Sequence, residues 1–144
     1  MTRILIVHGP NLNLLGDRDP GVYGSKTLEQ INADLHDQAH DMGLETRFFQ
    51  SNHEGELIDC LHRERHWAAG VIINPGALTH YSYALRDAVE AIGRPTVEVH
   101  LSDIRSREPF RRVSVLEDVC IAQMSGQGAQ SYSEALEQLR NEVS

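Results

Sequence analysis

The sequence predicts an α/β protein in which a parallel β-sheet is covered by helices on both faces. Short apolar runs alternate along the 144 residues with longer segments whose apolar residues recur every three or four positions. Runs of the first kind are typical of strands buried on both faces, and segments of the second kind are typical of helices with one buried face. Strands that alternate with helices form parallel sheets with right-handed crossovers.

The first third of the chain contains two predicted strands and a long helix. Residues 4–7 form a continuous apolar run, which predicts the first strand. The pattern becomes helical at Thr27, which can form a capping box with Gln30, and Gly43 is a natural end for this helix. Residues 44–50 read as the second strand. Between the first strand and the first helix, periodicity stops over residues 8–24.

The rest of the chain continues the alternation. Its predicted elements are helices over 55–69, 79–92 and 132–143 and strands over 71–73, 96–99 and 119–124. Asn74-Pro75-Gly76 ends the third strand, and Gly93 ends the helix before the fourth. Five strands in this order resemble a flavodoxin-like doubly wound sheet with helices on both faces, and we expect residues 1–144 to form one domain.

Composition excludes several kinds of partner. The net charge is −8, from 21 acidic and 13 basic residues, which argues against nucleic acid or an anionic membrane as the main partner. No apolar run approaches the roughly 20 residues of a membrane span, and the N-terminus reads as a strand rather than a signal peptide. Cys60 and Cys120 lie far apart in apolar settings. We interpret them as buried free thiols and expect a cytoplasmic protein.

Polar residues concentrate in the loops that follow the predicted strands. In doubly wound sheets, ligands bind beyond the carboxyl ends of the strands, so these loops form the predicted site. The alternative is that the loops are polar only because they are exposed. The loop residues are Asn11, Arg18 and Tyr23, then 51–54, then Asn74, Gly76 and His80, then 98–102, then 125–128.

Several kinds of chemistry are disfavoured. The single lysine, Lys26, is expected to be exposed, whereas a Schiff-base enzyme needs a desolvated lysine. No Gly-x-Gly-x-x-Gly or P-loop pattern follows the first strand. Three histidines in strand-end loops, His53, His80 and His100, lack a recognised metal-ligand spacing, so we expect no metal.

Acid–base chemistry remains. Glu98 and His100 are two residues apart and face the same side of a regular strand, so the carboxylate can orient the imidazole. Arg18 and Tyr23 share the irregular segment 8–24, and a cation beside a phenolic oxygen favours its ionised form, which is a base. Two simpler interpretations stay open: Glu98 and His100 could be merely polar strand ends, and Tyr23 a surface anchor.

Five motifs in register, spread over nearly the whole chain, resemble type II 3-dehydroquinate dehydratase, an enzyme of the shikimate pathway. They are GPNLNLLG, RDPGVYG, QSNHEGELID, NPGALTHYSYALRDA and EVHLS. The resemblance implies a flavodoxin-like fold, no cofactor, no Schiff-base lysine and conversion of 3-dehydroquinate to 3-dehydroshikimate through an enolate. A flavodoxin-like binding module without catalysis is the alternative function.

The resemblance also implies roles for five catalytic residues. Tyr23 matches the base that removes the proton beside the substrate ketone, and Arg18 matches the arginine that activates it. Asn11 matches the residue that supports the enolate oxygen through a bound water. His100 matches the general acid for the departing hydroxyl, with Glu98 behind it.

The same resemblance implies the substrate contacts and the assembly. Arg111, rather than the adjacent Arg112, matches the arginine for the substrate carboxylate or its neighbouring hydroxyls, and Asp87 matches an acidic residue contributed across a subunit boundary. A mobile lid is expected within about residues 16–25, and trimers are expected to gather into a homododecamer. Asp103 and Arg105 depart from the family pattern beside the site. The expected substrate-binding residues are Asn74, His80, Asp87, Leu101, Ser102 and Arg111.

Overall fold

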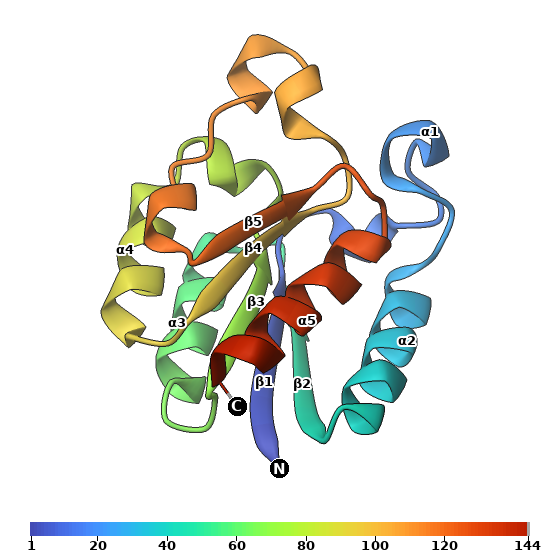
Figure 1. Cartoon of the computed structure of the whole chain (residues 1–144). Coiled ribbons are helices and arrows are strands. Elements are labelled where there is room, and N and C mark those ends of the chain that lie inside the picture. Colours follow the sequence, from blue (N-terminus) through green and yellow to red (C-terminus); the bar gives the residue numbers. More distant parts are fainter. Residues whose placement is uncertain (144) are drawn as a thin grey trace.

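A five-stranded, all-parallel sheet lies at the centre of the computed structural model, which describes residues 1–143 (Figure 1). Its strand order, β2-β1-β3-β4-β5, confirms the predicted flavodoxin-like doubly wound sheet. The second strand is added on one side of β1 and the later strands on the other side, so the order of strand addition reverses between β1 and β3. Doubly wound sheets bind ligands at such a switch point. The strands are β1 (Thr2–His8), β2 (Leu44–Gln50), β3 (Gly70–Asn74), β4 (Thr96–His100) and β5 (Ala122–Ser125).

Helices cover both faces of this sheet (Figure 1). Helices α2 (Leu28–Asp41) and α5 (Gln130–Val143) pack on one face, and α3 (Glu54–Glu64) and α4 (Tyr83–Ile92) pack on the other. Alternate residues of β1 enter the two cores, since Ile4 and Ile6 pack with α2 and α5 while Leu5 and Val7 pack with α3 and α4. A strand buried on both faces needs the continuous apolar run that the sequence contains.

Local signals account for where most helices begin and end. The predicted capping box at the start of α2 is present, with the Thr27 hydroxyl accepting from the Gln30 backbone N–H and the Gln30 side chain accepting from the Thr27 N–H. Gly43 and Gly93, which follow α2 and α4, adopt positive φ angles of 78° and 66°. Residues with a Cβ rarely adopt this conformation, but glycine has none, so the chain can leave each helix there without a steric penalty.

Three predicted boundaries are wrong by three or more residues. Helix α3 ends at Glu64 rather than at residue 69, because the Ala69 N–H donates to the Arg3 carbonyl at the start of the sheet. Helix α4 begins at Tyr83 rather than at residue 79, because the Ser82 hydroxyl caps it. Strand β5 begins at Ala122, since residues before it form a 3₁₀ turn, η5 (Glu117–Val119).

The segment 8–24 is less irregular than predicted. It contains a 3₁₀ turn, η1 (Leu12–Leu14), and one turn of helix, α1 (Pro20–Tyr23), which Asp19 caps. Helix α1 stands beside the carboxyl edge of the sheet in Figure 1. Three further 3₁₀ turns follow other strands: η2 (Gly76–His80), η3 (Ile104–Ser106) and η4 (Pro109–Arg111).

Candidate active site

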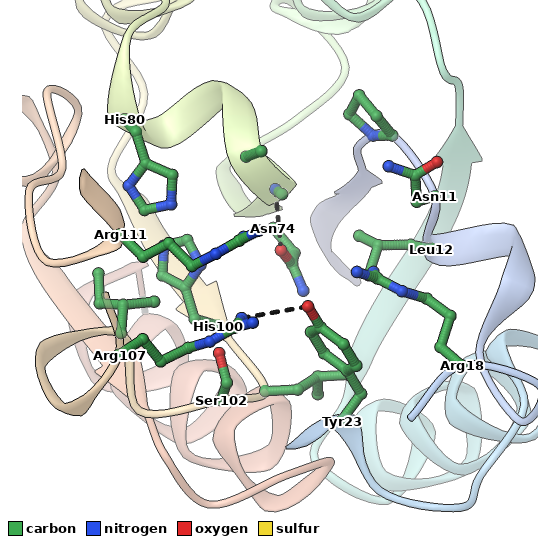
Figure 2. A pocket seen from close by; sticks show the side chains of 15 residues that line it. Asn11, Leu12, Arg18, Tyr23, Asn74, His80, His100, Ser102, Arg107 and Arg111 are labelled. Carbon is green, nitrogen blue, oxygen red and sulfur yellow. Dashed lines mark hydrogen bonds between the residues drawn. The ribbon is translucent and has the colours of Figure 1, made fainter. Parts of the chain in front are cut away.

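One pocket opens at the carboxyl ends of β1, β3 and β4, where the strand-end loops were predicted to meet (Figure 2). Nine of the eleven predicted site residues line it, from four separate stretches of the chain. The remaining two are Glu98, which lies directly behind His100, and Asp87, which is exposed on α4. The nine are Asn11, Arg18, Tyr23, Asn74, His80, His100, Leu101, Ser102 and Arg111.

The loops after β1 and β3 touch through their backbones. A Cβ on Gly9 would lie 2.6 Å from the Pro75 carbonyl oxygen, so only glycine permits this approach. The Gly9 N–H donates to the Asn74 carbonyl over 2.7 Å. Asn11 follows with φ at 70°, the one positive φ among the non-glycine residues that the structure describes. Asn tolerates this left-handed conformation, and the contact therefore places Asn11 at the mouth of the same pocket as Asn74.

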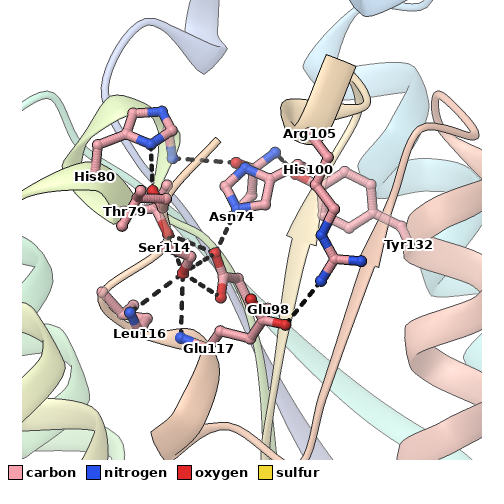
Figure 3. A network of polar contacts seen from close by, with 12 residues as sticks. Asn74, Thr79, His80, Glu98, His100, Arg105, Ser114, Leu116, Glu117 and Tyr132 are labelled. Carbon is pink, nitrogen blue, oxygen red and sulfur yellow. Dashed lines mark hydrogen bonds and ion pairs between the residues drawn. The ribbon is translucent and has the colours of Figure 1, made fainter. Parts of the chain in front are cut away.

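Glu98 and His100 form a buried hydrogen bond, as their spacing on one strand predicts (Figure 3). His100 Nε2 lies 2.5 Å from Glu98 Oε2, and the two side chains are 6% and 0% exposed. Since Nε2 is engaged by the carboxylate, Nδ1 is the ring nitrogen left for the pocket.

Two hydroxyl groups complete the shell around the Glu98 carboxylate (Figure 3). Thr79 donates to Oε2, and Ser114 lies 2.8 Å from both carboxylate oxygens. Burial opposes ionisation, but the hydrogen bonds and charge of His100, with those of Thr79 and Ser114, outweigh it and lower the pKa of Glu98 below its ordinary value. An ionised Glu98 can hold the His100 ring in one orientation and stabilise its charged form.

Tyr23 lies between two arginines (Figure 2). The guanidinium carbon of Arg18 lies 3.8 Å from the centre of the Tyr23 ring, which places the cation over the ring face rather than at the hydroxyl. The group at the hydroxyl is Arg107, whose Nη1 donates to Tyr23 Oη over 3.1 Å. The expectation that Arg18 lies near Tyr23 therefore holds in space, but the direct contact with the oxygen comes from a different arginine.

Further polar side chains face the pocket from η2 and η4. The His80 Nδ1–H donates to the Val113 carbonyl, which leaves Nε2 for a ligand. Arg111 is half-buried and pairs with Glu108 over 2.8 Å, while Arg112 does not line the pocket. Arg105 pairs with Glu117 and, like Asp103, does not line the pocket. The lining thus combines three arginines with neutral donors, a composition suited to a small anion rich in oxygen.

Nucleophilic and Schiff-base chemistry gain no support from the described residues. Lys26 is 53% exposed and pairs with Asp34 outside the pocket. Burial raises the pKa of the Cys60 thiol to about 11 and that of Cys120 to about 12, so neither is a thiolate at neutral pH. Within residues 1–143 no three His, Cys, Asp or Glu side chains gather as metal ligands would, and no helix is long and apolar enough to cross a membrane.

Sequence reasoning missed Arg107, Thr79 and Ser114. The one available signal for Arg107 was the density of arginines over residues 105–112, directly after the fourth strand. Nothing in the sequence distinguishes which of these arginines turns inward. The pattern places Thr79 at the first position of a predicted helix, and Ser114 lies in a segment without periodicity, so neither residue has a sequence signal of its own.

Comparisons with known proteins identify the family. A family model described as Dehydroquinase class II matches residues 2–140. A 3-dehydroquinate dehydratase from Halothermothrix orenii is 52% identical over 98% of this chain and 95% of its own length, and one from Pelotomaculum thermopropionicum is 58% identical over 93% of each. The crystal structure of a type II dehydroquinase from Butyrivibrio crossotus superposes with a TM-score of 0.94 at 41% identity, covering 96% of this chain and 97% of that one.

The match extends over both the fold and the loops that carry the pocket, because it runs almost from end to end of the chain and of its relatives. The chain therefore belongs to the type II dehydroquinase family.

Proposed function

We propose that this chain is a type II 3-dehydroquinate dehydratase, a hydro-lyase of the shikimate pathway that converts 3-dehydroquinate to 3-dehydroshikimate and water through an enolate. One observation carries the proposal beyond family membership: Tyr23 with its arginines and His100 with its carboxylate face one pocket. A base and an acid of these types suffice for an elimination without a cofactor. A binding module without catalysis is not favoured, because it leaves this arrangement without a use.

Tyr23 acts as the base in this proposal. Its phenolate oxygen accepts the proton beside the substrate ketone, and the electron pair of the broken C–H bond moves onto the ketone oxygen as an enolate. Arg18 over the ring and Arg107 at the hydroxyl place two positive charges beside Tyr23, which stabilises negative charge on its oxygen. Asn11 supports the enolate oxygen through a bound water.

His100 acts as the acid. When the enolate collapses, the bond to the departing hydroxyl breaks and a His100 N–H supplies the proton that turns it into water. The Glu98 carboxylate, held by Thr79 and Ser114, stabilises the charged imidazole until that proton leaves. Tyr23 ends the cycle protonated and His100 neutral, so a proton must return from one to the other through solvent before the next turnover.

The remaining lining residues bind the substrate. Arg111 and its guanidinium fork are assigned to the carboxylate or the hydroxyls beside it, because planar donors match a carboxylate in two bonds. Its pairing with Glu108 is an exposed contact that substrate can replace. The other proposed substrate contacts are Asn74, His80, Leu101 and Ser102.

Residues 16–25 are proposed to form a mobile lid on a single catalytic domain that spans residues 1–144. The segment carries both Arg18 and Tyr23, and Gly16 and Gly24 at its two ends have φ angles of 98° and 85°. Glycines can rotate between such conformations without a steric penalty, so they are suited to act as hinges. Closure of this segment would exclude water while the enolate exists.

The assembly is proposed to be a homododecamer built from trimers, in the cytoplasm. Asp87 lies exposed on α4, outside the pocket of its own chain, which is compatible with a role in the site of a neighbouring subunit. Closed, symmetric assemblies are the usual outcome when one surface of a subunit completes another.

The direct test of this function is a continuous ultraviolet assay for the conjugated product with purified protein and 3-dehydroquinate. We expect turnover without added metal or cofactor. Absence of product formation by the folded protein would overturn the proposal.

A further inference from the structure

A chain of polar side chains runs beneath the pocket, and only its last member, Asn74, has a part in the mechanism above. It starts at Asn32 on α2, crosses β1 at His8, reaches Tyr132 on α5 and ends at Asn74 (Figure 3 shows the last two). His8 Nε2 lies 2.8 Å from Asn32 Oδ1, His8 Nδ1 lies 2.8 Å from Tyr132 Oη, and Asn74 Nδ2 lies 3.1 Å from the same Oη. His8 and Tyr132 are each 0% exposed.

The protonation states of this chain determine the direction of each hydrogen bond. Burial lowers the pKa of His8 to about 4, so the ring is neutral and has one N–H at neutral pH. That hydrogen belongs on Nε2, because the partner there is the acceptor oxygen of Asn32. Nδ1 is therefore an acceptor, and the Tyr132 hydroxyl, whose pKa burial raises, donates its proton to it.

Tyr132 then has no hydrogen left for Asn74 and can only accept from it. The Asn74 amide must turn its NH₂ group toward Tyr132, as the Nδ2 contact has it. A second contact requires the same orientation, because Asn74 Oδ1 accepts from the Gly76 N–H over 3.1 Å. Both ends of the amide are thus held, and one Nδ2 hydrogen remains for the pocket that Asn74 lines (Figure 2).

We propose that Tyr132 is a positioning residue for substrate binding, whose hydroxyl, oriented by His8 and Asn32, holds the Asn74 amide so that it presents an N–H donor to an oxygen of the substrate. The inference rests on the proposed function, since Asn74 is there a substrate contact. It adds a selectivity: the group opposite Asn74 must be an acceptor, such as a carboxylate, carbonyl or hydroxyl oxygen. A donor group placed opposite Asn74 would face the amide N–H and could form no hydrogen bond with it.

The test replaces Tyr132 by Phe, which removes one oxygen and keeps the buried ring. Because Asn74 contacts the substrate before and during the reaction, we expect Tyr132→Phe to raise KM about tenfold with kcat within about threefold. Thr96→Val is the matched control. It also removes a buried hydroxyl, one that donates to the Arg94 carbonyl at the opposite end of the sheet, and it should leave KM unchanged.

A double-mutant cycle separates positioning from a general loss of stability. In an Asn74→Ala background, the Tyr132→Phe change should have no further effect on KM. An unchanged KM in the single variant, or a KM effect that persists fully without the Asn74 amide, would overturn the proposal. If Tyr132→Phe fails to fold, Asn32→Ala, which alters a half-buried residue, must raise KM by a smaller factor, and an unchanged KM there also overturns it.

The crystal structure of Tyr132→Phe gives a readout that needs no activity. We expect the Asn74 amide to rotate away from its wild-type orientation, and an unmoved amide with its hydrogen bonds assigned as before would contradict the inference. Wild-type protein that fails to convert 3-dehydroquinate would instead refute the proposed function, so the two failures are distinguishable.

Discussion

Substitution of His8 should make the fold less sensitive to acid. His8 has an ordinary pKa of 6.5, and burial lowers the pKa of His8 in the fold to about 4. Between these values the unfolded chain binds a proton on His8 that the folded chain does not. Stability is therefore complete above pH 6.5, falls as the pH decreases, and levels out below about pH 4.

The size of this effect follows from the two pKa values. Each pH unit between them costs up to about 1.4 kcal/mol, which gives about 3 kcal/mol over the whole window and about 2 kcal/mol between about pH 7 and about pH 5. The lowered pKa of Glu98 acts in the same direction, but its stabilisation is lost only as the pH falls below the ordinary value of 4.5. The window from pH 5 to pH 7 thus separates the contribution of His8 from that of Glu98.

Urea unfolding at fixed protein concentration measures the difference. Wild-type protein should lose about 2 kcal/mol more free energy of unfolding than His8→Gln on going from about pH 7 to about pH 5. Thr96→Val, which is destabilised at a buried site without a titratable group, should keep the wild-type pH dependence. Equal pH dependence of wild type and His8→Gln would refute the assignment of a neutral, buried His8.

Three further predictions concern the site and the assembly. Arg107→Leu should lower turnover much more than Arg105→Leu, since Arg107 donates to Tyr23 and Arg105 pairs with Glu117 at the surface; equal losses in the steady-state assay would remove Arg107 from the mechanism. Borohydride with substrate should neither inactivate the protein nor leave an adduct in its intact mass, and a reduced adduct on Lys26 would overturn the enolate route. Light scattering should find a dodecamer. A stable trimer would exclude only the dodecamer, and a fully active monomer would exclude a site shared between subunits.

Much of the fold follows from local sequence signals. The apolar runs of β1 and β3 are typical of covered strands, and the Thr27 capping box with Gly43 marks both ends of α2. The predicted end of α3 is wrong because a tertiary contact decides it, and the predicted start of α4 is wrong because the Ser82 cap and the contact of Thr79 with Glu98 decide it. The Ala69 N–H belongs to the sheet and Thr79 turns toward Glu98, and neither interaction leaves a trace in helical periodicity.

The site was predictable where its partners are neighbours in sequence. Glu98 and His100 share a strand face, and Arg18 and Tyr23 share a short segment, so spacing alone brings each pair together. Arg107 meets Tyr23 across 84 positions of the chain, and such a contact depends on how two loops fold over the sheet edge. For the same reason no local pattern indicates that Tyr132 would reach Asn74, 58 positions away.

Turnover of 3-dehydroquinate by wild-type protein and by Tyr23→Phe tests the central claim most directly. The substitution keeps the ring that packs against the core and removes the one oxygen that is proposed to accept the substrate proton. With the far-ultraviolet circular dichroism and the oligomeric state unchanged, we expect active wild-type protein and a kcat lower by at least about 10²-fold in the variant. Near-normal kcat in Tyr23→Phe would contradict the assignment of the base and with it the mechanism.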